Sequence, residues 1–133
     1  MTEECRTLSQ REMLALSVSK VGIWDWHIET GELYLAPNLK ALLGYQDHEM
    51  PNRLDDWAKT VHPDDLDRVT EALNAHLNGK AHLYEVTNRM VHKDGTTRWF
   101  LTRGIAIRDA SGKAVRLIGT DIDITSAFGF MLR

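Results

Sequence analysis

The chain has 133 residues, of which 43% are hydrophobic and 26% are charged, a length and composition typical of one globular domain. Its 16 basic and 19 acidic residues give a net charge of −3, which argues against nucleic acid as a partner, since phosphate binding needs positive charge. No apolar run approaches the roughly 18 residues that a membrane-spanning helix needs, so none is expected within this chain. The single cysteine, Cys5, permits no internal disulfide and the start lacks an apolar signal-peptide core, so we expect a cytoplasmic protein.

The first twenty residues predict an amphipathic helix. Ser9 is the expected N-cap, and Glu12 stands where it would complete a capping box. We expect this segment, residues 1–20, to cover the domain or to mediate dimerisation.

A hairpin and a helical middle section follow. Apolar and polar residues alternate over residues 23–28, which predicts a strand, and after a turn residues 33–36 predict a second one. Short helices are expected near residues 38–43 and 54–61, and a longer one over residues 63–78. His62 is expected to cap that helix, with Asp64 and Asp65 facing the positive end of its dipole.

Three strands are predicted in the last third of the chain, over residues 81–92, 97–108 and 114–125. The dipeptides Asp94-Gly95 and Ser111-Gly112 between them are typical of hairpin turns. Two strands, then helices, then three strands predict an α+β fold with an antiparallel sheet.

Five motifs follow one another along the chain: Gly22-Ile23-Trp24-Asp25-Trp26, Leu42-Leu43-Gly44-Tyr45, Val61-His62-Pro63-Asp64-Asp65, Lys93-Asp94-Gly95-Thr96-Thr97-Arg98-Trp99 and Ile118-Gly119-Thr120-Asp121-Ile122-Asp123-Ile124-Thr125. In this order they resemble the PAS sensor-domain family, with its C-terminal PAC-type motif, as found in bacterial signalling proteins. The resemblance spans residues 21–125, which leaves residues 126–133 as a tail or the start of a linker. Relatives usually continue with a charged helix, whereas this tail is apolar and contains Gly129, so both a stand-alone domain and a piece of a longer protein stay open.

The resemblance implies a five-stranded antiparallel sheet in the order 2-1-5-4-3, with helices packed on one face and a small-molecule cavity between the two layers. It also implies a sensory module for signal transduction, such as two-component signalling. Such a module binds a small ligand or cofactor and relays a conformational signal to an effector, for example a histidine kinase or a diguanylate cyclase. The alternative is a ligand-free dimerisation or interaction module, whose cavity Trp, Phe and Met side chains fill.

By comparison with flavin-binding members of the family, we expect five side chains of the last three strands to face the cavity. Asp121 stands where flavin-binding relatives carry a glutamine, and an ionised carboxylate cannot donate a hydrogen bond. If buried, Asp121 needs a partner or a raised pKa. The ligand stays unidentified, with a non-covalent flavin or another small organic molecule open; a cysteinyl adduct is not expected, since Cys5 precedes the domain. The five residues are Asn88, Met90, Phe100, Thr102 and Asp121.

Two helical residues complete the candidate site. Trp57 precedes the long helix and is expected at the cavity mouth. His76 borders the apolar stripe of that helix and is the candidate axial ligand of a haem, although a histidine in this position is more often packed in the core. The alternating pattern of Trp24 and Trp26 favours a core role for both. No metal-binding motif such as CxxC or HExxH occurs.

The outer face of the sheet carries an apolar set that is costly to leave in water. We expect the N-terminal helix or a second copy of the chain to cover it, which predicts a homodimer. No catalytic motif is present, so we expect a sensor rather than an enzyme, with any catalytic activity on a separate effector domain. The apolar set is Ile23, Trp99, Leu101 and Ile105.

Overall fold

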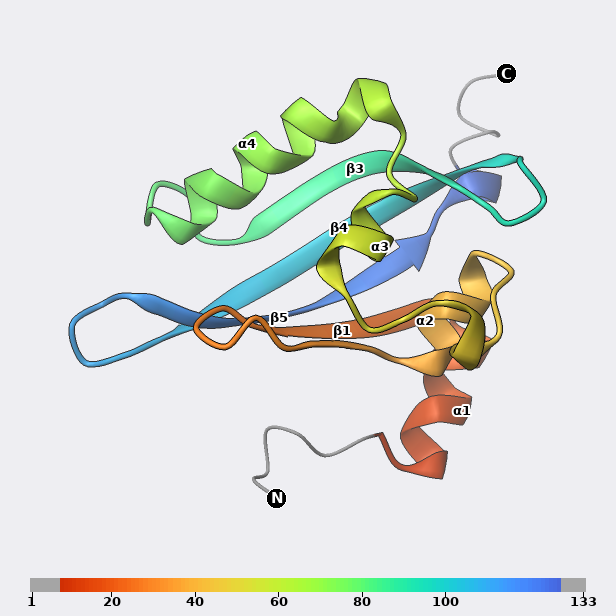
Figure 1. Cartoon of the computed structure of the whole chain (residues 1–133), viewed down its shortest axis with the longest axis horizontal. Helices are drawn as coiled ribbons and strands as arrows, with labels where there is room; N and C mark the ends of the chain where they lie inside the picture. Colours follow the sequence, from red (N-terminus) through yellow and green to blue (C-terminus); the bar gives the residue numbers. More distant parts are fainter. Residues whose placement is uncertain (1–7, 128–133) are drawn as a thin grey trace.

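The computed structural model of the chain describes residues 8–127. Five antiparallel strands form one sheet in the order β2-β1-β5-β4-β3; in Figure 1, α3 lies in front of the sheet and α4 runs alongside β3. This confirms the predicted fold class and strand order. The strands are β1 (Val21–His27), β2 (Leu33–Leu35), β3 (Tyr84–Val91), β4 (Thr97–Arg108) and β5 (Ala114–Asp123).

The helices follow the predicted order, and the helix expected near residues 54–61 ends at Ala58. The predicted long helix over residues 63–78 starts as a 3-10 turn, η3 (Pro63–Asp65), and becomes α-helical at Leu66. The third strand begins at Tyr84, three residues later than predicted, because Lys80 and Ala81 both donate to the carbonyl of Ala75 and fold the chain back over the helix end. The helical segments are α1 (Gln10–Val18), α2 (Pro37–Leu42), η2 (Asp47–Glu49), α3 (Leu54–Ala58), η3 and α4 (Leu66–Leu77).

Helix α1 begins with the predicted capping box. The Ser9 backbone N–H donates to Glu12 Oε1 at 3.0 Å, and the Glu12 N–H donates to Ser9 Oγ at 3.2 Å. No residue of α1 is buried, and the helix lies beside α2 at the lower edge of the sheet (Figure 1). Cys5 and most of the predicted tail over residues 126–133 fall outside the described residues.

The indole of Trp24 lies across two glycines of neighbouring strands. Gly119 of β5 is the register partner of Trp24, and Gly104 of β4 is the register partner of Gly119. A Cβ at Gly104 would stand 2.6 Å from Trp24 Cη2, and one at Gly119 would overlap the ring. Because neither glycine has a side chain, the Trp24 ring packs directly on the backbone of β4 and β5. Tyr84 of β3 packs against the indole edge-on, with ring centroids 6.1 Å apart.

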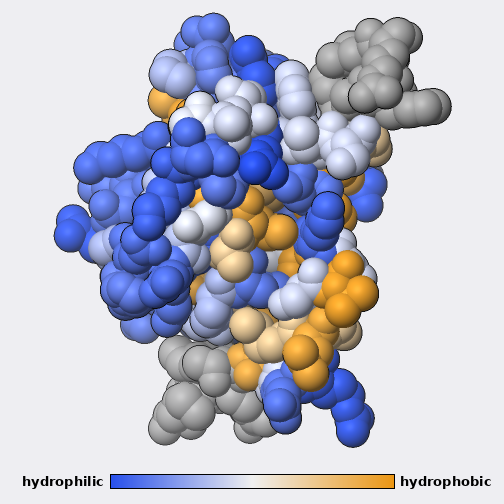
Figure 2. Space-filling view, turned by 90° about the vertical axis from the view of Figure 1, so that its right-hand side faces the viewer, coloured by the Kyte–Doolittle hydropathy of each residue, from blue (hydrophilic) through white to orange (hydrophobic). Residues whose placement is uncertain are grey.

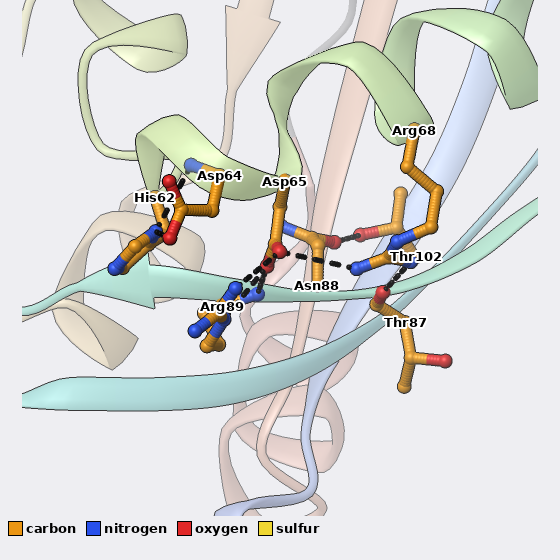
Figure 3. Close-up of polar contacts among 8 residues, drawn as sticks. All are labelled: His62, Asp64, Asp65, Arg68, Thr87, Asn88, Arg89 and Thr102. Atoms are coloured by element: carbon orange, nitrogen blue, oxygen red, sulfur yellow. Dashed lines mark hydrogen bonds and ion pairs between the residues drawn. The ribbon is translucent and has the colours of Figure 1, made fainter.

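A buried ion pair fastens η3 to β3. Asp65 is 3% exposed, and it accepts from the Arg89 backbone N–H at 2.6 Å, from Arg89 Nε at 3.1 Å and from Arg89 Nη2 at 2.7 Å. Arg68 approaches the same carboxylate at 3.3 Å, and its guanidinium also donates to the Thr87 carbonyl (Figure 3). These bonds hold the pKa of Asp65 well below its usual range, with the Arg89 side chain as the main cause. Asp65 was predicted to interact with the helix dipole, but its main partner in the structure is Arg89. His62 caps η3, as predicted, because its Nδ1 accepts from the Asp64 N–H at 3.1 Å.

The outer face of the sheet is partly exposed. Ile23, Trp99 and Leu101 are half-buried, while Ile105 is 54% exposed. Figure 2 shows hydrophobic residues gathered at the lower right-hand side of the molecule. Among the described residues, no helix has the length and apolar character to cross a membrane.

We expect Gly119→Ala to lower the free energy of unfolding by about 1–3 kcal/mol, the usual cost of overpacking a core. The new methyl group would overlap the Arg103 carbonyl oxygen and Trp24 Cζ2, so both the backbone of β4 and the indole would have to shift. Urea unfolding measures this cost. The control is Thr120→Ala at the next residue of β5, whose side chain faces the other side of the sheet, with an expected change below about 1 kcal/mol. Equal losses in the two variants would contradict the packing role of Gly119.

Candidate functional site

A cavity of about 240 Å³ lies between the inner face of the sheet and the two helices α3 and α4. Two of its lining residues, Leu54 and Leu66, are 46% and 39% exposed, which places the opening between α3 and the start of α4. Apolar side chains form most of the wall. The lining residues are Trp24, Trp26, Leu33, Leu35, Leu54, Trp57, Ala58, Val61, Leu66, Val69, Thr70, Leu73, Tyr84, Asn88, Met90, Thr102, Leu117 and Asp121.

Five of the seven residues proposed from sequence line this cavity: Trp57, Asn88, Met90, Thr102 and Asp121. The sequence reasoning did not assign Tyr84 to the site, although this residue also lines the wall. The period-2 alternation that places Asn88 and Met90 on the inner face of β3 extends back to Tyr84. That signal was therefore present in the sequence.

Phe100 faces inward, as expected, but it does not line the cavity. It is fully buried beside Leu43, Val61 and Met90 in a second core cluster. Its role in the structure is packing, which corrects the expectation that it contacts a ligand.

His76 also lies outside the cavity lining, because the polypeptide backbone uses both of its ring nitrogens. Nε2 accepts from the Ala106 N–H at 2.9 Å, so Nδ1 carries the proton that it shares with the Ala81 carbonyl at 2.9 Å. A ring with both nitrogens engaged offers no lone pair to iron. His76 therefore ties the end of α4 to β4, and its assignment as a haem ligand is corrected.

The polar part of the cavity is a cluster on the sheet. The Thr102 hydroxyl donates to Asp121 Oδ1 at 2.7 Å and lies 3.3 Å from Asn88 Oδ1. Trp24 Nε1 donates to the same Asp121 oxygen at 3.3 Å. Figure 3 shows Asn88 and Thr102 pointing toward one another from neighbouring strands. Asp121 is 2% exposed and Asn88 is 3% exposed, so this cluster is shielded from bulk water.

Burial raises the pKa of Asp121 to about 6, and the hydrogen bonds from Thr102 and Trp24 oppose this shift only in part. Burial and the nearby Asp121 charge also raise the pKa of the Tyr84 hydroxyl. Of the residues that the structure describes, no lysine, arginine or histidine lines the cavity. The cavity thus holds a carboxyl group without a cationic partner in its wall.

The residues present do not fit a flavin. An isoalloxazine has three fused rings and carries a ribityl chain, whereas about 240 Å³ is below the roughly 300–1,000 Å³ usual for drug-sized ligands. Asp121 also presents a carboxyl where a ring edge needs a donor and an acceptor together. Among the described residues, no group of three or more histidine, aspartate or glutamate side chains is arranged to hold a metal ion.

We expect Asp121→Asn to gain stability relative to the wild type as the pH rises from 4 to 7. Because the folded-state pKa is about 6 and the ordinary value is 3.8, the folded protein holds a proton that the unfolded chain has lost. The free energy of unfolding of the wild type therefore falls over this window by up to about 1.4 kcal/mol per pH unit. Asparagine does not titrate, so the variant lacks this pH dependence. Urea unfolding at each pH measures the difference, with Asp67→Asn on the exposed side of α4 as a control for the loss of one negative charge. A constant difference from pH 4 to 7 would contradict the raised pKa.

Comparisons with known proteins agree with this architecture. A family model described as PAS fold matches residues 32–121. A sensory box histidine kinase/response regulator from Burkholderia thailandensis is 37% identical, with a TM-score of 0.77, over 92% of this chain and 90% of that structure. The N-terminal domain of a diguanylate cyclase with a PAS/PAC sensor from Marinobacter aquaeolei is 30% identical, with a TM-score of 0.70, over 82% of this chain and 99% of that one. The comparison with curated proteins gives no match.

The family model covers more than half of the chain, and both structures show the same sheet-and-helix arrangement at 30% identity or more. The chain therefore belongs to the PAS family of sensor domains.

Proposed function

We propose that this domain binds a small organic ligand in its cavity and relays the binding event to an effector. The observation that carries the proposal is the combination of a tryptophan-rich apolar wall with one buried polar cluster, Asn88, Thr102 and Asp121. Apolar walls with a few well-placed polar groups are typical of small-molecule sites, in which the polar groups fix the orientation of the ligand.

The cavity volume limits the size of the ligand. A dry apolar cavity of about 150 Å³ accepts benzene, so about 240 Å³ suits a molecule of on the order of ten non-hydrogen atoms. The opening beside Leu54 and Leu66 provides its route of entry.

The relay is a population shift, in which ligand contacts favour one arrangement of α3 and α4 over the sheet. By likeness to its two relatives, we propose a histidine kinase or a diguanylate cyclase as the effector. Catalytic activity then belongs to that effector, and a single cysteine suits a place in the reducing cytoplasm.

We expect the purified wild-type protein to carry a small extra mass, or to take one up from a cell extract, when native mass spectrometry is used. Ala58→Trp should prevent this, because Ala58 lines the cavity and the indole would occupy the space. Ala110→Trp makes the same chemical change in the exposed β4–β5 turn and should leave uptake intact.

A wild-type protein that stays free of any ligand would contradict ligand binding and favour the alternative, a ligand-free interaction module. Uptake that is equal in the wild type and Ala58→Trp would place the ligand elsewhere.

Self-association is a second proposed function, and exposed apolar residues favour it. In α1, Leu14 and Val18 are 61% and 84% exposed, and on the outer sheet face Ile105 and Ile107 are 54% and 43% exposed. Burying such side chains against a second copy would stabilise the association by about 25 cal/mol for each Å² of apolar surface removed from water. We propose a homodimer that forms through α1 and the outer face.

We expect the double substitution Leu14→Glu and Val18→Glu to convert this dimer to a monomer, because two charges would be buried in an apolar contact. Light scattering coupled to gel filtration gives the mass. Arg11→Glu with Ser17→Glu adds charge at exposed positions of the same helix and serves as the control. An unchanged dimer mass in the first variant, or a monomeric wild type, would overturn the proposed interface.

A further inference from the structure

We propose that the ligand of this cavity is a small organic cation, a protonated amine on an apolar body, and that the Asp121 carboxylate selects it. This inference rests on the proposed function and adds the chemical class of the ligand. It is built from three features of the cavity: an unmatched charge, an oxygen that is left available and an aromatic wall.

The first feature is the unmatched charge. Burying a carboxylate is costly unless a cation or several hydrogen bonds accompany it. The other buried carboxylates of the described residues meet this rule: Asp65 pairs with Arg89, and Asp25 pairs with Arg116 at 2.6 Å and 2.9 Å. Asp121 is at least as buried as both, yet neutral hydroxyl and indole groups are its partners. A cationic ligand would supply the missing charge.

The second feature is the oxygen that remains for a ligand. Both hydrogen bonds to Asp121, from Thr102 and from Trp24, end on Oδ1. Within residues 8–127 the second oxygen, Oδ2, accepts no hydrogen bond, and the side chain lines the cavity. An ammonium group carries three donors and can place one of them on this oxygen.

The third feature is the aromatic wall. Three of the four tryptophans of the chain line the cavity, together with Tyr84. Aromatic faces attract ammonium groups through their quadrupole, most strongly where water is excluded. The same rings pack against an apolar body of the ligand, so one wall serves both parts of an amine. These residues are Trp24, Trp26, Trp57 and Tyr84.

The pH dependence of binding follows from the groups that face Asp121. Trp24 faces it from β1, Asn88 and Tyr84 from β3, and Thr102 from β4, while α3 and α4 contribute no titratable side chain to the lining. Within residues 8–127, Asp121 is thus the only lining group that titrates between pH 5 and 8. An alkylamine keeps its proton to about pH 10, so binding should strengthen as Asp121 ionises.

The test uses three probes of similar size: 2-phenylethylamine, 2-phenylethanol and 3-phenylpropionate. Titration calorimetry on the full chain at pH 7.5 should show the amine binding about tenfold or more tightly than the alcohol, the usual gain from a hydrogen bond to a charged group. The carboxylate probe should bind more weakly than the alcohol, because Asp121 repels it. Affinity for the amine should fall at pH 5, whereas affinity for the alcohol should not.

Two variants locate the effect. Asp121→Asn should abolish the preference for the amine and retain binding of the alcohol, which shows that the cavity is still formed. Asp56→Asn removes a negative charge from α3, outside the cavity lining, and should keep the preference. Thermal unfolding followed by circular dichroism checks that each variant folds.

The outcomes separate this inference from the proposed function. Equal binding of amine and alcohol, or an amine preference that survives in Asp121→Asn, overturns the inference and leaves a ligand-binding cavity. Failure of all three probes also overturns it, and the native mass measurement then decides whether the proposed function fails as well.

Discussion

The placement of Trp24 across Gly104 and Gly119 is the constraint on which the rest of the domain depends. A sheet whose inner face carried side chains at those two positions would push the indole into the space between the layers. Because the glycines let the ring rest on the backbone of β4 and β5, its Nε1 reaches Asp121 and its edge meets Tyr84. Because the indole of Trp24 lies flat over these glycines, it takes up less of the space between the sheet and the helices.

That packing explains how a carboxyl group comes to stand in an apolar chamber. Asp121 follows Gly119 by two residues on β5, so the alternation of a strand places both on the inner face. Trp24 covers one side of the carboxyl and Thr102 bonds it from the next strand, which fixes its position without neutralising its charge. A fixed and uncompensated charge in a largely buried pocket would discriminate between ligands, because a cation gains an ion pair there whereas an anion is repelled.

The helix above the cavity is anchored by polar contacts at both ends, and its middle faces the cavity with apolar side chains. At its start, Asp65 pairs with Arg89 of β3, and Arg68 donates to the Thr87 carbonyl of the same strand. At its end, His76 bonds the Ala106 N–H of β4. The middle of α4 contributes Val69 and Leu73 to the cavity wall and makes contacts there that are apolar and without fixed direction. In the relay that we propose, a ligand would press on this middle span while both ends of the helix stay bonded to β3 and β4.

The sequence by itself determined the fold class, the strand order through its family resemblance, and most of the inward-facing residues. Alternation and turn chemistry are local properties, so the strands and the turns between them were predicted from short patterns. The comparison with flavin-binding relatives then implied that Asn88, Thr102 and Asp121 face the cavity. The capping role of His62 and the capping box of Ser9 are local in the same sense. Even Tyr84 belonged to the predicted alternation, although it was not assigned to the site.

Only the tertiary structure decided which partners these residues have. Asp65 and Arg89 stand 24 residues apart in the chain, and no local pattern relates their spacing, so a predicted dipole contact proved to be a buried ion pair. The ring nitrogens of His76 are hydrogen-bonded to backbone groups from two separate segments, and Phe100 packs in a second core cluster. Neither residue therefore lines the cavity. That no cationic side chain of the described part of the chain lines the cavity beside Asp121 likewise depends on how the wall is assembled. Pairing and desolvation depend on distances between segments that are remote in sequence, and the folded chain alone sets those distances.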